Sequence, residues 1–123
     1  MAYLTDHKRA SGLGSAKSGT EHHWKMMVSS VALVPLILAF IFTFGAVLGR
    51  PYEEVLAYYQ RPVPAAIAAL TFLVGFYHFR GGVQTLIEDY VHGFARKATI
   101  IGMICLSYTA AALGVLAVLR LAL

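Results

Sequence analysis

The sequence contains few charged residues, and three long stretches contain none at all. Asp, Glu, Lys and Arg make up 13% of the 123 residues, about half of the roughly 25% that is usual in a soluble domain. All four residue types are absent from residues 26–49, 62–79 and 98–119. Three such stretches leave too little polar surface to keep a chain of this length in solution. The shortage of charge therefore excludes a soluble globular domain, and no polar segment is long enough to fold alone.

Cysteine is almost absent as well, since Cys105 is the only one. A single thiol excludes an internal disulfide framework and a cysteine-ligated iron–sulfur cluster, which takes four thiolates. Cys105 lies inside the third uncharged stretch, where we expect a small apolar packing residue. The net charge of +4 comes from cations that flank the uncharged stretches. Because they form no basic stripe with interleaved aromatic residues, we expect no nucleic-acid partner.

The three uncharged stretches are apolar and long enough to cross a membrane. A helix needs about 20 apolar residues to cross the roughly 30 Å hydrocarbon layer, and the middle stretch reaches this length if its helix continues past Arg80 toward Ile87. The sequence thus predicts an all-α integral membrane protein with three transmembrane helices that form part of a multi-subunit helical bundle. The predicted segments are a polar N-terminal segment 1–25, transmembrane helix 26–49, an outer loop 50–62 with a short interfacial helix, transmembrane helix 63–87, an inner loop 88–97, transmembrane helix 98–119 and a C-terminal tail 120–123.

Lysine and arginine residues near the predicted spans indicate their orientation. Six lie on one side of the membrane, namely Lys8, Arg9, Lys17, Lys25, Arg96 and Lys97. Three lie on the other side, namely Arg50, Arg61 and Arg120. The cytoplasmic side of a membrane protein carries the excess of these residues. We therefore expect the N-terminus inside and the C-terminus outside.

One stretch places polar side chains inside apolar sequence: GFYHFRGGVQTLIEDYVH, residues 75–92. If His78 and Asp89 lie on one continuous helix, they point in nearly the same direction about 16 Å apart along its axis. Ionisable side chains within a span are candidates for function. The simpler alternatives are that His78 only bonds a neighbouring helix, that Arg80 extends toward the headgroups, and that Gly81 and Gly82 serve helix packing.

The functional interpretation of this stretch is a haem site. A neutral imidazole deep in a helical bundle is a suitable axial ligand for haem iron. The other histidines, His7, His22, His23 and His92, lie near the predicted inner face, so only His78 is deep enough to hold a buried haem from this chain. The second axial ligand would then come from another polypeptide. Arg80 and the basic residues of the inner face could neutralise the haem propionates.

The run HFRGGVQTLIEDYVHG, residues 78–93, resembles the membrane-anchor D subunits of succinate dehydrogenase, respiratory complex II. In that family a histidine on the second span is followed eleven residues later by an Asp-Tyr pair, as His78 is by Asp89 and Tyr90. The segments SGTEHHWK and VALVPL are also similar to the family's entry into the first span. The family often has an arginine just after the tryptophan, where this chain has Met26 and Met27, so Lys25 is the nearest cation.

This resemblance implies specific roles. His78 would ligate haem b, Tyr90 would hydrogen-bond a ubiquinone carbonyl, and Asp89 would tune that tyrosine or help to deliver protons. Lys25 and Arg80 would contact the haem propionates. The expected partners are a cytochrome b556-type C anchor subunit, an iron–sulfur subunit and a flavoprotein subunit, besides membrane lipid.

The anchor itself would carry out no dehydrogenation, since the chain lacks flavin and iron–sulfur ligands. We expect it in the inner, cytoplasmic membrane of a bacterium rather than in the mitochondrial inner membrane. Two alternatives remain at this point. One is a small transporter or channel subunit that uses Arg80 and Asp89 as a charge relay. The other is a structural anchor of the same family without haem.

Overall fold

The computed structural model describes residues 3–14 and 19–123, and its regular elements are all helices. Lys17, one of the cations counted for the orientation, lies outside the described residues. The helices are α1 (Asp6–Ser11), α2 (Glu21–Gly45), α3 (Tyr52–Tyr59), α4 (Pro62–Tyr90) and α5 (Gly93–Ala122). Three of them, α2, α4 and α5, are long and apolar enough to cross a membrane. The prediction of an all-α protein with three transmembrane helices is confirmed.

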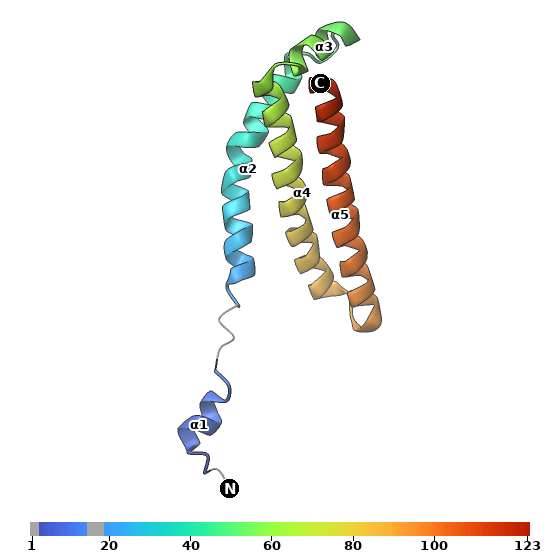
Figure 1. The fold of residues 1–123 in the computed structure, drawn as a ribbon. Coiled ribbons are helices and arrows are strands. Elements are labelled where there is room, and N and C mark those ends of the chain that lie inside the picture. Colours follow the sequence, from blue (N-terminus) through green and yellow to red (C-terminus); the bar gives the residue numbers. More distant parts are fainter. Residues whose placement is uncertain (1–2, 15–18) are drawn as a thin grey trace.

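α4 lies between α2 and α5 and packs against both (Figure 1). The three long helices alternate in direction, so the α4–α5 connection and the start of α2 lie at one end, and α3 and the C-terminus at the other. We call these the inner end and the outer end, following the predicted orientation. Figure 1 shows the helices close together at the outer end, whereas α2 and α5 lie on either side of α4 at the inner end.

The outer end contains the apolar core. Val47 just after α2, Tyr59 of α3, Ala68 of α4 and Val118 of α5 are buried there, and Phe40 of α2 packs against them. Burial raises the pKa of the Tyr59 phenol, and the neighbouring Tyr58 raises it further, so the phenol stays neutral. α3 lies within the predicted outer loop 50–62, where the sequence suggested a short interfacial helix. Its position at the membrane surface stays a prediction.

At the inner end the helices extend beyond the predicted spans. Residues 88–97 were expected to form a loop, but α4 continues to Tyr90 and α5 begins at Gly93, so Val91 and His92 alone connect them. The backbone can reverse within this short distance because Gly93 adopts a φ of 66°, a left-handed conformation that glycine adopts at little cost. The loop was placed by its charges, and charged residues can equally lie on helix ends beyond the hydrocarbon layer. Where that layer begins along each helix stays a prediction.

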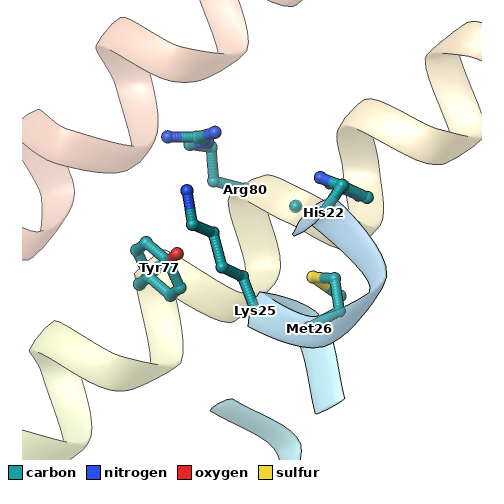
Figure 2. Close-up of a pocket in the computed structure, with 6 residues that line it drawn as sticks. His22, Lys25, Met26, Tyr77 and Arg80 are labelled. Atoms are coloured by element: carbon teal, nitrogen blue, oxygen red, sulfur yellow. The ribbon is translucent and has the colours of Figure 1, made fainter. Parts of the chain in front are cut away.

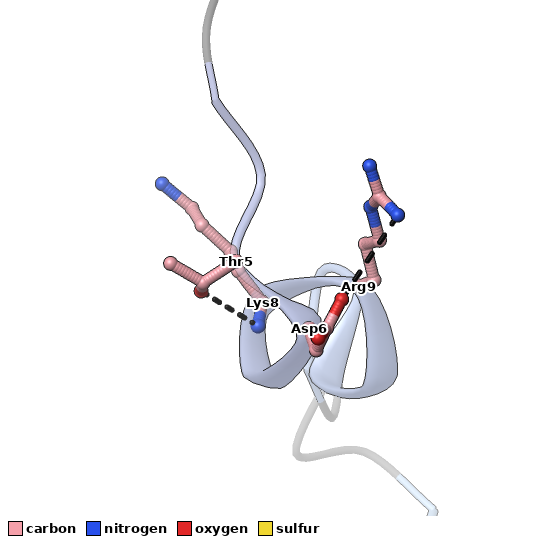
Figure 3. Close-up of polar contacts among 4 residues, drawn as sticks. All are labelled: Thr5, Asp6, Lys8 and Arg9. Carbon is pink, nitrogen blue, oxygen red and sulfur yellow. Dashed lines mark hydrogen bonds and ion pairs between the residues drawn. The ribbon is translucent and has the colours of Figure 1, made fainter.

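The polar N-terminal segment 1–25 contains a short helix and the first turns of α2. α1 begins after Thr5, whose Oγ1 accepts a hydrogen bond from the backbone N–H of Lys8 at 3.3 Å (Figure 3). Arg9 and Asp6 form an exposed ion pair with a separation of 4.0 Å. These contacts are local to the helix, as expected for a capped turn.

Candidate functional site

One face of α4 carries several of the residues that the sequence analysis singled out. α4 is continuous from Pro62 to Tyr90, so His78 and Asp89 point in directions that differ by only about 20°. Gly75 and Gly82 lie three residues before and four residues after His78, which places them on the same face. We call this surface, defined by Gly75, His78, Gly82 and Asp89, the His78 face. It presents an imidazole and a carboxylate with two positions that lack side chains.

Ser29 of α2 fixes the His78 ring. The Ser29 side chain is buried, and its Oγ lies 2.9 Å from His78 Nδ1. The same Oγ lies 2.9 Å from the backbone carbonyl oxygens of Lys25 and Met26. When the single hydroxyl proton is donated to one of these carbonyl oxygens, Ser29 Oγ accepts a hydrogen bond from His78 Nδ1–H. His78 Nε2 is then the nitrogen with a free lone pair, which is the form of histidine that binds a metal ion.

The glycines near His78 have two different structural settings. A Cβ atom on Gly81 would overlap the sulfur of Met26, so Gly81 allows α2 to pack closely against α4. A Cβ on Gly75 would meet no atom within 4 Å, and on Gly82 the nearest atom would be Met26 Cε at 3.8 Å. Helix packing therefore explains Gly81. Gly75 and Gly82 leave the α4 backbone accessible to a flat group.

Arg80 points away from the His78 face. Residues two apart on a helix differ in direction by about 200°, and Arg80 Nη1 donates to the Tyr108 hydroxyl of α5 at 2.7 Å. The guanidinium carbon also lies 5.8 Å from the centre of the Tyr108 ring. No carboxylate pairs with Arg80 among the residues that the structure describes. The Arg80 guanidinium therefore contacts both the hydroxyl and the ring of Tyr108, and it has no counter-ion in the described part of the chain.

A small polar cavity lies between α2 and α4 at the inner end. It has a volume of about 30 Å³ and is lined by His22, Lys25, Met26, Tyr77, Arg80 and Gly81. Figure 2 shows Lys25 extending from α2 past the Tyr77 ring toward Arg80 on α4. The structure thus brings together the two cations predicted to contact the haem propionates. It does not place Arg80 on the His78 face.

Asp89 and Tyr90 lie exposed at the inner end of α4. The Tyr90 side chain is 78% exposed, and neither residue forms a side-chain hydrogen bond or ion pair within the described residues. Asp89 and Arg80 are nine residues apart on one helix and therefore point in opposite directions, about 180° apart. This geometry provides no direct contact for the charge relay considered as an alternative function.

Ser29 and Tyr108 were missed by the sequence analysis. Each is a hydroxyl-bearing residue within an apolar span. Ser29 bonds His78, and Tyr108 bonds Arg80. Hydroxyl groups occur often in transmembrane helices, so their presence alone gave no signal. The partner helix becomes apparent only when the direction of each side chain around α4 is known.

No group of three or more His, Cys, Asp or Glu side chains within the described ranges could hold a metal ion. A haem with two histidine ligands, however, takes one imidazole from each of two helices, and these can belong to different chains. His78 fits this requirement: its Nδ1 is bonded, its Nε2 is free, and it is flanked by the open positions of Gly75 and Gly82. The residues present are therefore suitable for one half of a haem site.

Comparison with known proteins identifies the family. Residues 1–121 match the family model described as succinate dehydrogenase/fumarate reductase transmembrane subunit. The chain is 44% identical over 123 residues to the succinate dehydrogenase hydrophobic membrane anchor subunit of Paracoccus denitrificans, which covers all of this chain and 95% of the relative. It is 32% identical over 97 residues to the corresponding subunit of Rickettsia bellii, covering 76% of this chain and 74% of the relative. A membrane anchor subunit of Reclinomonas americana is 29% identical over 80 residues, covering 63% of this chain and 67% of the relative.

No solved structure matches the chain. The family match nevertheless spans nearly the whole sequence, and the three apolar helices agree with a multi-pass membrane subunit. The chain belongs to the succinate dehydrogenase/fumarate reductase transmembrane-subunit family, as a membrane anchor of succinate dehydrogenase.

Proposed function

We propose that the chain supplies one axial ligand of a haem b shared with a second anchor subunit, and part of the ubiquinone-reduction site of succinate dehydrogenase. The observation that carries this proposal is the bond between Ser29 and His78, which leaves Nε2 free to bind iron. In this function the chain docks a flavoprotein and an iron–sulfur subunit to the membrane. The subunit that provides the second haem ligand is a cytochrome b556-type C anchor.

His78 and its surroundings would hold the haem as follows. Ser29 keeps the imidazole in one tautomer and one orientation, as partners of metal-bound histidines generally do. The open positions at Gly75 and Gly82 admit a flat ring close to the backbone. The contact of Lys25 and Arg80 with the haem propionates stays a prediction, and Arg80 points away from the His78 face toward Tyr108 of α5. Bound haem supplies one-electron storage between the iron–sulfur subunit and the quinone.

Tyr90 and Asp89 would act at the quinone. A quinone carbonyl becomes more basic as it is reduced, so a phenol that donates to this oxygen interacts more strongly as charge develops. The Tyr90 hydroxyl is exposed at the inner end of α4, where a partner subunit and a quinone can reach it. Asp89, one residue earlier, is also exposed and unpaired within the described residues, which suits a group that passes protons from the aqueous side.

The proposed location is the inner, cytoplasmic membrane of a bacterium, with the N-terminus inside. The excess of lysine and arginine near the inner end supports this orientation. It places Tyr90 on the same side as soluble subunits that oxidise succinate in the cytoplasm. The relative in Paracoccus denitrificans, a bacterium, supports the bacterial location.

Replacing His78 tests the proposal. In the assembled complex, His78→Ala should remove or convert the low-spin haem b absorbance, because Nε2 is the only proposed iron ligand from this chain. His92→Ala is the matched control, since His92 is exposed in the α4–α5 connection. An unchanged low-spin spectrum in the assembled His78→Ala complex would show that another residue ligates the iron.

A further inference from the structure

The polar cavity at the inner end is lined by cations and hydrogen-bond donors. Lys25 and Arg80 carry positive charge, Tyr77 adds a phenol, and none of the six lining residues is acidic. Glu21 pairs with Lys25 and so offsets part of the charge. Arg80 has no carboxylate partner in the described part of the chain. Such a cavity favours an anion with several acceptor oxygens, as phosphate has.

An open groove continues from this cavity along the same two helices. It has a volume of about 310 Å³ and is lined by Trp24, Lys25, Val28, Ser29, Ala32, Val74 and Tyr77. Lys25 and Tyr77 border both the cavity and the groove, so the two hollows are contiguous. Beyond Lys25 and the Tyr77 phenol the groove is mainly apolar, and the Ser29 hydroxyl is already bonded to His78 and to the α2 backbone. A ligand that fills both hollows needs a compact anionic end and an apolar chain.

The sequence gives the depth of the two hollows in the membrane. Lys25 is the last charged residue before the uncharged stretch 26–49, and Trp24 is a residue type that favours the headgroup level. Ala32 lies about 10 Å deeper along α2. The cavity therefore lies near the headgroups and the groove extends into the hydrocarbon layer. We propose that this surface binds an acidic phospholipid, with its phosphate between Lys25 and Arg80 and one acyl chain in the groove.

The lipid surface is distinct from the His78 face. Arg80 points about 200° away from His78 and Tyr77 about 100° away, on the side of α4 away from Gly75 and Gly82. The two surfaces adjoin at Ser29, which lines the groove and bonds His78. A haem ligated by His78 would be next to Gly75 and Gly82, which line neither hollow. The lipid proposal does not require His78 to bind haem, but it excludes the propionates as the anion of Lys25 and Arg80. It differs from the propionate assignment in giving Lys25 and Arg80 a phosphate as their anion.

Lipid binding to the complete complex tests the proposal. The complex is placed in nanodiscs of phosphatidylcholine with increasing amounts of phosphatidylglycerol, and the lipids that remain bound are counted by native mass spectrometry. Wild type should retain phosphatidylglycerol above its proportion in the disc. Because a cation near an anionic headgroup contributes about a fivefold change in binding, Lys25→Gln and Arg80→Gln should each lower retention about fivefold. Arg96→Gln, which removes an exposed cation at the same end, is the matched control and should change nothing.

Two further measurements distinguish the possible sources of the anion. Ala32→Phe fills the groove without changing any charge and should lower phosphatidylglycerol retention as well. Glycerol 3-phosphate, which has the phosphate but no acyl chain, should not displace the lipid. Displacement by glycerol 3-phosphate, or retention in the bulk proportion by wild type, would overturn the proposal. So would loss of haem absorbance with unchanged lipid in Lys25→Gln or Arg80→Gln, since the cations would then serve the propionates.

Discussion

The bond between Ser29 and His78 can be tested by removing only the hydroxyl. Ser29→Ala keeps the size of the residue within one atom and leaves the His78 Nδ1–H without its acceptor. Ser29 is 6% exposed, so water reaches the vacated position poorly. The imidazole then loses both its fixed orientation and part of its basicity. We expect a haem that is bound more weakly and reduced more easily.

The size of the effect follows from the role of such partners. Losing a hydrogen-bond partner of a metal-bound histidine lowers metal affinity about 10- to 100-fold. A less basic imidazole stabilises ferric haem less, so the loss falls mainly on the oxidised form. A tenfold change in the equilibrium of a one-electron couple equals about 59 mV. Ser29→Ala should therefore raise the haem potential by about 60 mV, with about 120 mV as the upper limit.

Redox titration of the haem absorbance in the purified complex measures this shift. Ser30→Ala is the matched control, because Ser30 is the next residue, is exposed and bonds only the carbonyl oxygen of Met26 at 2.7 Å. Ser29→Thr keeps the hydroxyl and should restore most of the potential. If Ser29→Ala and Ser30→Ala have the wild-type potential and haem content, Ser29 does not position the iron ligand.

Three further predictions concern the quinone site, the orientation and the packing. Tyr90→Phe deletes a hydrogen-bond donor, and the rate of ubiquinone reduction should fall by about two orders of magnitude. Electron transfer from succinate to a soluble dye should survive. A wild-type rate of ubiquinone reduction would mean that Tyr90 is only an interfacial residue. A reporter fused after residue 123 should read as external, and a cytoplasmic signal would reverse the topology. A Cβ on Gly114 would lie 2.7 Å from the Phe72 ring, so Gly114→Ala should destabilise the complex by about 1–3 kcal/mol in thermal unfolding. Gly102→Ala is the control and should leave the stability unchanged, because a Cβ there meets no atom within 4 Å. Equal unfolding midpoints for the two variants would contradict the close packing of Gly114 against Phe72.

The spans could be predicted from the sequence because they depend on one strong physical requirement. A helix in lipid must exclude charge over the thickness of the hydrocarbon layer, and the three uncharged stretches satisfy it visibly. A continuous helix through His78 and Asp89 was only a supposition, because the predicted segments end the second span at residue 87 and place Asp89 in the inner loop. α4 carries both residues. Its regular geometry then fixed the common direction of these two side chains before any contact was known.

The partners of the polar residues could not be predicted in this way. His78 bonds to Ser29 on α2, whereas Arg80 bonds to Tyr108 on α5. His78 and Arg80 are only two residues apart on α4. This division depends on which helices lie on the two sides of α4, and a hydropathy pattern contains no such information. The expected loop 88–97 was too long for a related reason, since charge marks the edge of the membrane and does not mark the end of a helix.

The difference between the two ends of the helices has a consequence for biogenesis. At the outer end the apolar side chains of all three spans contact one another, so this part can form as soon as the helices insert. At the inner end Gly75 and Gly82 leave the His78 face open within the described part of the chain, so lipid would meet the imidazole until another subunit arrives. Ionisable groups exposed to lipid are unfavourable. An unassembled copy is therefore locally unstable at its inner end. Its lifetime in the membrane should depend on the supply of its partner subunits.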